Sequence, residues 1–144
     1  MIKFVRMMMM FVKCIGSDLY VDMDGTVLCS SLDDEFKKEC SENEFKVALD
    51  WYNRMYVNDL SINWGLIVVL IVMKGLGSRV VGWTNRGEEQ RSMTEDNLGM
   101  LLGSVFSEVM YHSGQKGKTS VDGVVVDNEE KYLSCGTHGV HVVY

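Results

Sequence analysis

The stretch Asp22-Met23-Asp24-Gly25-Thr26 decides the interpretation of this chain. It follows the short apolar run 19–21, which is typical of the end of a buried β-strand. Two nearby carboxylates repel each other, so a fold rarely keeps them together without a cation or a shared proton. Mg²⁺ suits such a site, because it prefers oxygen ligands and binds through carboxylates and substrate phosphate. The alternative is an acidic turn that closes the strand, since Asp-Gly pairs are common in turns.

Size and composition indicate one globular domain over residues 1–144, with 47% apolar and 24% charged residues. The net charge of −6 argues against a protein that mainly grips nucleic-acid backbone, which needs clustered Lys and Arg. The four cysteines form no C-x-x-C pair and no disulfide framework, which indicates reduced thiols and a cytoplasmic location. The apolar run 66–73 is too short to cross a bilayer, and we expect no membrane partner.

Strand-like and helix-like segments alternate along the chain, which predicts an α/β fold. We expect a Rossmann-like three-layer sandwich around a mainly parallel central sheet. The run 62–74 suits a strand or a helix by pattern, but the glycines after it and the strand that follows favour a helical crossover. The expected strands are 18–23, 79–83, 105–111, 123–127 and 140–143, and the expected helices are about 42–57, 62–74, 88–102 and 129–135.

Polar side chains follow four of the expected strands. In an open parallel sheet these strand ends share one edge, where ligands bind. Carboxylates, a hydroxyl, amides and an ammonium together fit a magnesium-bound phosphoryl group. The chain lacks the glycine patterns of dinucleotide sites, P-loops and nucleophile elbows. In chain order the pairs are Asp22 with Asp24, Thr84 with Asn85, Lys116 with Lys118, and Asp127 with Asn128.

On these motifs the chain resembles the haloacid dehalogenase (HAD) superfamily of phosphohydrolases over residues 18–144. The first motif is V-D-M-D-G-T-V-L at 21–28, the second G-W-T-N-R at 82–86, and the fourth V-V-V-D-N at 124–128. The third motif in that family is little more than a lysine. The pattern T-N-R-G-x-x-x-R-x-x-T-x-x-N-L at 84–98 also resembles small HAD phosphatases of phages and the acid-phosphatase branch.

The resemblance implies an aspartyl-phosphate mechanism. Asp22 would attack phosphorus, and Asp24 would protonate the leaving oxygen and later activate water. Thr84 would hydrogen-bond phosphate oxygens. Lys116 or Lys118 would balance the charge, with Lys116 slightly favoured for the catalytic role. The further residues that would contact substrate are Gly25, Thr26, Asn85, Arg86 and Lys118.

The resemblance also implies a Mg²⁺ site made by Asp22, the backbone carbonyl of Asp24, and Asp127. Asn128 stands where the family often has a second acid, and it could hold a metal-bound water. The family often carries a cap domain at the position of residues 29–60, where there is room for a minimal helical cap only.

Several readings stay open at this stage. Alone, Asp127 and Thr84 are ordinary helix caps, and Arg86 could equally lie on a solvated helix surface. A small phosphomonoester such as a nucleotide is the favoured substrate, and a nucleic-acid 3′ end is the alternative. A homodimer, a phosphotransferase and a non-catalytic HAD-fold binding protein are also left open.

Overall fold

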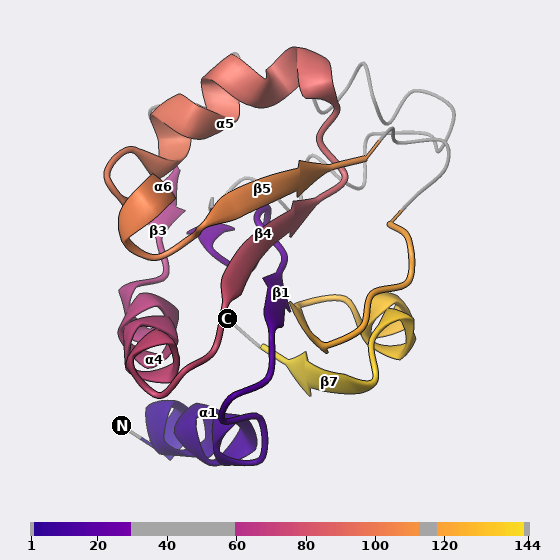
Figure 1. The fold of residues 1–144 in the computed structure, drawn as a ribbon. Coiled ribbons are helices and arrows are strands. Elements are labelled where there is room, and N and C mark those ends of the chain that lie inside the picture. The colour runs from indigo at the N-terminus through magenta and orange to yellow at the C-terminus, as the bar shows by residue number, and fades with distance from the viewer. Residues whose placement is uncertain (1, 30–59, 113–117, 143–144) are drawn as a thin grey trace.

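Five parallel strands form the central sheet in the computed structural model, which describes residues 2–29, 60–112 and 118–142 (Figure 1). The strand order is β5-β4-β1-β6-β7, and every neighbouring pair is parallel. The predicted mainly parallel sheet of an α/β Rossmann-like sandwich is therefore confirmed. The strands are β1 Leu19–Val21, β4 Val80–Thr84, β5 Glu108–Tyr111, β6 Val124–Asp127 and β7 His138–His141.

The alternation of side chains along the strands divides the core into two parts, one on each face of the sheet. Leu19 and Val21 of β1 point into the larger cluster, whereas Tyr20 points into the smaller one. The valines of β6 alternate in the same way and are all buried. These two central strands are therefore apolar on both faces, as parallel strands require.

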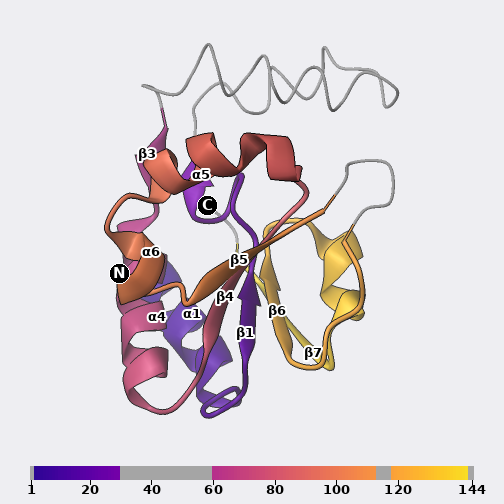
Figure 2. The same ribbon diagram turned by 45° about the horizontal axis from the view of Figure 1, so that its top comes forward.

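Helices cover the two faces unequally. The larger cluster joins the sheet to the helices α1, α4, α5 and α6 (Figures 1 and 2), whereas the smaller one, which contains Trp83 of β4, is covered by the 3₁₀ helix η3. None of the helices in the described residues is long and apolar enough to cross a membrane. The bounds are α1 Ile2–Val12, α4 Trp64–Gly75, α5 Arg91–Leu98, α6 Leu101–Ser104 and η3 Glu130–Cys135.

The helix predicted over 62–74 is confirmed as α4, which begins one residue after the cap Asn63. The predicted helix over 88–102 is divided into the 3₁₀ helix η2 (Glu88–Gln90), α5 and the single turn α6. Gly99 separates α5 from α6 and Gly103 interrupts α6, because both have positive φ, which right-handed helices exclude. The helix predicted over about 42–57 lies outside the described residues.

A short antiparallel pair of strands follows the Asp22–Thr26 stretch. Strand β2 (Leu28–Cys29) pairs with β3 (Ser61–Ile62), with Cys29 opposite Ser61. The two ends of the predicted cap insertion, near residues 29 and 60, therefore lie side by side.

The order of the strands reverses on either side of β1. Chain order runs from β1 through β4 to β5 on one side, and from β6 to β7 on the other. Ligands of open α/β sheets bind at such a reversal, outside the carboxyl ends of the strands. Here the reversal lies between the end of β1, followed by Asp22, and the end of β6, which is Asp127.

The helix α1 is an integral part of the core, which a pair of variants tests. Phe11 is 1% exposed, and Phe11→Ala should lower the free energy of unfolding by about 3–5 kcal/mol because it leaves a cavity. Met9 lies on the same helix but is 66% exposed, so Met9→Ala should change the free energy of unfolding by at most about 0.5 kcal/mol. Urea denaturation measures both values, and equal losses would contradict the position of α1.

Candidate active site

A buried lysine joins the ends of β1 and β6. Lys118 Nζ lies 2.7 Å from Asp22 Oδ1 and 2.8 Å from Asp127 Oδ2. The Lys118 and Asp127 side chains are each 1% exposed and that of Asp22 is 10% exposed. Two acids that are far apart in the sequence therefore meet at the point where the strand order reverses.

The charges of this trio do not balance, since two carboxylates share one ammonium. Burial, and then the charges of Asp127 and Asp24, raise the pKa of Asp22 to about 7, even though Lys118 lowers it. Burial alone would lower the pKa of Lys118, but Asp22 and Asp127 outweigh it and the pKa is raised. Lys118 is therefore a fixed positive charge, and Asp22 is poised to lose its proton near neutral pH.

Two aromatic rings enclose the Lys118 ammonium. Its Nζ lies 4.4 Å from the ring centroid of Trp83 and 4.6 Å from that of Tyr132, within the range of cation–π attraction. Sequence reasoning missed both residues as part of the site. Trp83 belongs to an apolar strand pattern, and no motif marks Tyr132. The rings exclude water from the ammonium and strengthen its interactions with the two carboxylates.

Thr26 and Asn128 close the network around Asp22. Thr26 Oγ1 donates to Asp22 Oδ2 over 2.9 Å and accepts from the Asn128 backbone N–H over 3.1 Å. With its amide nitrogen turned toward the acids, Asn128 donates to Asp22 Oδ2 over 3.0 Å and to Asp127 Oδ1 over 3.1 Å. Gly25 has a φ of +84°, and an added Cβ would lie 2.7 Å from the Asn128 side-chain amide, so glycine is required there.

Asp24 is held by Arg86 rather than facing Asp22. Arg86 Nε donates to Asp24 Oδ2 over 2.9 Å, and Arg86 Nη2 donates to Asp24 Oδ1 over 2.6 Å. The Arg86 side chain is 0% exposed, which excludes the solvated helix surface that the sequence leaves open. Such two-point pairing fixes the orientation of a carboxylate.

The other contacts of Arg86 account for the polar pattern at 84–98. Its Nη1 donates to Thr94 Oγ1 over 3.1 Å and to Asn97 Oδ1 over 2.8 Å. Its backbone N–H donates to Thr84 Oγ1 over 3.1 Å, so four members of the pattern belong to one network. Arg91, by contrast, pairs with Glu88 at the surface.

The second predicted pair, Thr84 and Asn85, lies at the end of β4. Thr84 is 1% exposed, and Asn85 Nδ2 donates to Tyr132 Oη over 2.8 Å. No donor in the described part of the chain reaches the buried Asn85 Oδ1, which leaves an acceptor beside the site. Lys116, the lysine that the sequence slightly favours, lies outside the described residues, so the structure places only Lys118.

Asp127 combines the role of a turn cap with that of a site residue. Its Oδ1 accepts from the Glu129 backbone N–H over 2.9 Å, as in an Asx turn, and its Oδ2 accepts from Lys118. His141 lies opposite Asp127 on β7 and contacts the Asn128 carbonyl through Nε2 over 2.9 Å. The end of β6 is therefore fixed from both sides.

The donor chemistry suits Mg²⁺, although Lys118 rather than a cluster of acids joins the carboxylates. No group of three His, Cys, Asp or Glu side chains within residues 2–29, 60–112 and 118–142 is arranged around a common metal position. The side chains of Asp22 and Asp127 nevertheless offer hard oxygen atoms at one edge, with one negative charge in excess. A divalent cation would offset that charge, so these residues fit the ion.

Comparisons of the chain with protein-family models, with curated proteins and with solved structures find no match.

The raised pKa of Asp22 predicts a pH-dependent effect of Asp22→Asn on stability. The folded value of about 7 exceeds the reference value of 3.8, so between these values the folded state binds more protons than the unfolded state. The free energy of unfolding of the metal-free protein therefore falls as pH rises through this window, and Asp22→Asn removes that loss. The Tm of the variant should rise relative to the unmodified protein from about pH 5 to about pH 8.

Thermal unfolding in the presence of a chelator measures this difference, and Asp96→Asn, which removes an exposed acid of α5, is the matched charge control. A difference for Asp22→Asn that stays constant over this pH range would contradict the electrostatic description of the site.

Proposed function

We propose that the chain is a Mg²⁺-dependent phosphohydrolase of the HAD superfamily that cleaves a phosphomonoester through an aspartyl-phosphate on Asp22. One observation carries the proposal: Lys118 bridges Asp22 and Asp127 at 2.7 and 2.8 Å, at the edge where the strand order reverses. A structural ion pair needs one carboxylate for one ammonium. Two buried carboxylates around one ammonium favour a site that receives a further cation.

Asp22, Asp127, Asn128 and the backbone carbonyl of Asp24 are the groups that would hold Mg²⁺. The bound ion would supply charge neutralisation, which lets an anionic carboxylate approach an anionic phosphate and favours the ionised form of Asp22. Lys118 adds a fixed positive charge to the same edge, because its raised pKa keeps it protonated.

Asp22 is the nucleophile in this proposal. One carboxylate oxygen forms a bond to phosphorus as the bond between phosphorus and the ester oxygen breaks, and the ester oxygen takes a proton from Asp24. Lys118 and Thr26 donate to different oxygens of Asp22, which fixes the carboxylate plane before the attack. In the second step water attacks phosphorus, gives a proton to Asp24 and releases phosphate, which regenerates Asp22.

Arg86 controls when Asp24 can act. Both Asp24 oxygens accept from Arg86 in the free protein, so Asp24 must turn away from this pair to reach a leaving group. The Asp24 side chain is 19% exposed, whereas Arg86 is enclosed, so the acid is the mobile partner. Arg86 is thus a positioning residue in this proposal, which modifies its predicted role as a direct substrate contact.

The end of β4 supplies contacts to the phosphoryl group. Thr84 ends the strand beside β1, and its hydroxyl oxygen accepts from the Arg86 backbone N–H, so its own proton is available to donate to a phosphate oxygen. Asn85 follows directly, and its Nδ2 would have to leave Tyr132 Oη to donate to phosphate. We infer a small phosphomonoester such as a nucleotide as substrate, because the net charge of −6 disfavours long nucleic acids. A panel of nucleotides, sugar phosphates and 3′-phosphorylated oligonucleotides tests this choice, and activity on the oligonucleotides alone would overturn it.

Hydrolysis of p-nitrophenyl phosphate tests the proposed reaction. The unmodified protein should release p-nitrophenol with Mg²⁺ and lose this activity with a chelator. Asp22→Asn should lower kcat/KM by at least about a thousandfold, because it removes the nucleophile. Asp96→Asn removes an exposed acid and should leave the rate unchanged. Equal rates for both variants would exclude Asp22 as the nucleophile.

A second candidate is a binding protein that keeps the site but does not turn over substrate. The observations that favour it are the pairing of both Asp24 oxygens with Arg86 and the amide of Asn128 in place of a second acid. Such a protein would bind phosphate or a phosphomonoester without forming a covalent intermediate.

Trapping of the intermediate in Asp24→Asn separates the two candidates. The p-nitrophenolate leaving group needs little protonation, so Asp22 should still be phosphorylated, whereas loss of the general base slows hydrolysis by about 10²–10⁴-fold. Intact mass spectrometry should then show the mass of one added phosphoryl group, which the double variant Asp22→Asn, Asp24→Asn lacks. Absence of the adduct from Asp24→Asn, with no turnover by the unmodified protein, would favour the binding protein.

A further inference from the structure

The outer surface that the helices α1 and α4 form is largely apolar. Helices α1 and α4 pack side by side over the same face of the sheet (Figures 1 and 2). Many large apolar side chains on these two helices are exposed rather than buried. We call this surface the α1–α4 face and define it by Ile2 (72% exposed), Val5 (47%), Met9 (66%), Val12 (62%), Trp64 (60%), Val68 (49%), Ile71 (52%) and Val72 (45%).

Helical spacing places these side chains opposite the core. On α1, Phe4, Met7 and Phe11 pack inward, and the exposed residues lie on the other side of the helix. On α4, Leu66, Leu70 and Met73 are buried, and Trp64, Val68 and Ile71 lie on the opposite side. Because the helices are neighbours in one layer, their outer sides form one surface. Soluble proteins rarely expose a continuous apolar surface of this extent without a partner.

Charge is separated between this layer and the rest of the molecule. Residues 1–17 and 60–78, which contain α1 and α4, carry four basic side chains and no Asp or Glu. The basic residues are Lys3, Arg6, Lys13 and Lys74. Since the whole chain has a net charge of −6, the remainder carries −10. Within residues 1–17 and 60–78 the apolar surface is thus accompanied only by positive charge, whereas the whole chain is acidic.

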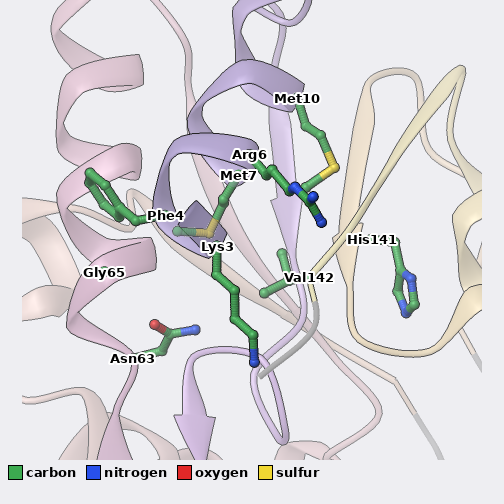
Figure 3. A pocket seen from close by; sticks show the side chains of 9 residues that line it. All are labelled: Lys3, Phe4, Arg6, Met7, Met10, Asn63, Gly65, His141 and Val142. Atoms are coloured by element: carbon green, nitrogen blue, oxygen red, sulfur yellow. The ribbon is translucent and has the colours of Figure 1, made fainter. Parts of the chain in front are cut away.

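A pocket on the flank of α1 adds to this arrangement. It has a volume of about 670 Å³ and lies between α1, the start of α4 and the end of β7 (Figure 3). Its described lining includes Lys3 and Arg6, apolar side chains such as Phe4 and Met7, and no acid. The pocket therefore offers positive charge and apolar surface together, beside the α1–α4 face.

We propose that the α1–α4 face docks on the surface of an anionic lipid bilayer. Exposed apolar side chains would enter the boundary between headgroups and acyl chains, and the four cations would contact anionic headgroups. Trp64 lies at one end of the surface, and tryptophan favours that boundary. The proposal concerns surface docking without spanning, and it departs from the expectation of no membrane partner, which rests on segment length. It is independent of the proposed phosphatase activity.

A second copy of the chain is a less suitable partner. A symmetric dimer through this face would bring two sets of cations together, and neither helix has an acid to pair with them. An anionic bilayer supplies the complementary charge, at about 1 kcal/mol for each Lys or Arg near the surface. The acidic remainder would be repelled by the same bilayer, which favours one orientation of the docked protein.

Co-sedimentation with vesicles tests the proposal. The full chain should bind vesicles of phosphatidylcholine with 30% phosphatidylserine, bind pure phosphatidylcholine at least about tenfold more weakly, and lose affinity in 0.5 M NaCl. The double variant Val68→Glu, Ile71→Glu should lower the partition coefficient at least about tenfold, because it removes apolar area and adds repulsive charge. Trp64 fluorescence should shift to shorter wavelength on the anionic vesicles, and Trp64→Phe should remove that shift.

Met100→Glu is the matched control, because Met100 is an 83% exposed apolar side chain that lies on neither helix. It should leave the partition coefficient unchanged, and circular dichroism should confirm that all variants are folded. Absence of binding to anionic vesicles, or equal loss in Met100→Glu and the double variant, would overturn the proposal. A dimer seen by light scattering that the double variant alone abolishes would instead assign the face to self-association.

Discussion

The Lys118 ammonium between two buried carboxylates is the interaction on which the arrangement of the site depends. It joins the acid after β1 to the acid at the end of β6, and the Asn128 amide contacts both acids beside it. The removal of three charged groups from water costs free energy. The single ammonium neutralises only one of the two carboxylates, so one negative charge stays uncompensated. A core designed for stability alone would place apolar side chains there. The pKa of Asp22 is raised in the free protein because burial disfavours its charged form.

The two acids of the Asp22–Thr26 stretch have opposite environments. Hydrogen-bond donors contact both carboxylate oxygens of Asp22, and burial and the neighbouring acids raise its pKa. Asp24 is more exposed and has a guanidinium as its partner. Carboxylates two positions apart can do different chemistry only when their surroundings differ in this way. Asp22 is held by donors from several residues, whereas the Asp24 carboxylate is held by Arg86 and can turn only when that pair opens.

The sequence predicts the sheet and several members of the site for a physical reason. Apolar runs mark the ends of β1, β4 and β6, so residues that follow them, such as Asp22 and Thr84, could be placed at one edge. The loop after β5 gives no such information, because a lysine in a polar loop resembles any solvated charge. The sequence therefore slightly favours Lys116 over Lys118. Only the fold shows that Lys118 is enclosed by Trp83 and Tyr132. The burial of Arg86 was likewise hidden, since its acidic partner lies 62 positions away.

The site and the α1–α4 face are adjacent yet separable. Asn63 caps α4 by accepting from the Leu66 backbone N–H, and its Nδ2 donates to the Thr26 carbonyl over 3.2 Å. Since the Thr26 hydroxyl binds Asp22, the start of α4 is connected to the site by two hydrogen bonds. Val68 and Ile71 lie beyond the first turn of α4 and point away from the sheet, so their substitution leaves this connection intact. A change at Asn63 would disturb both features and could not distinguish them.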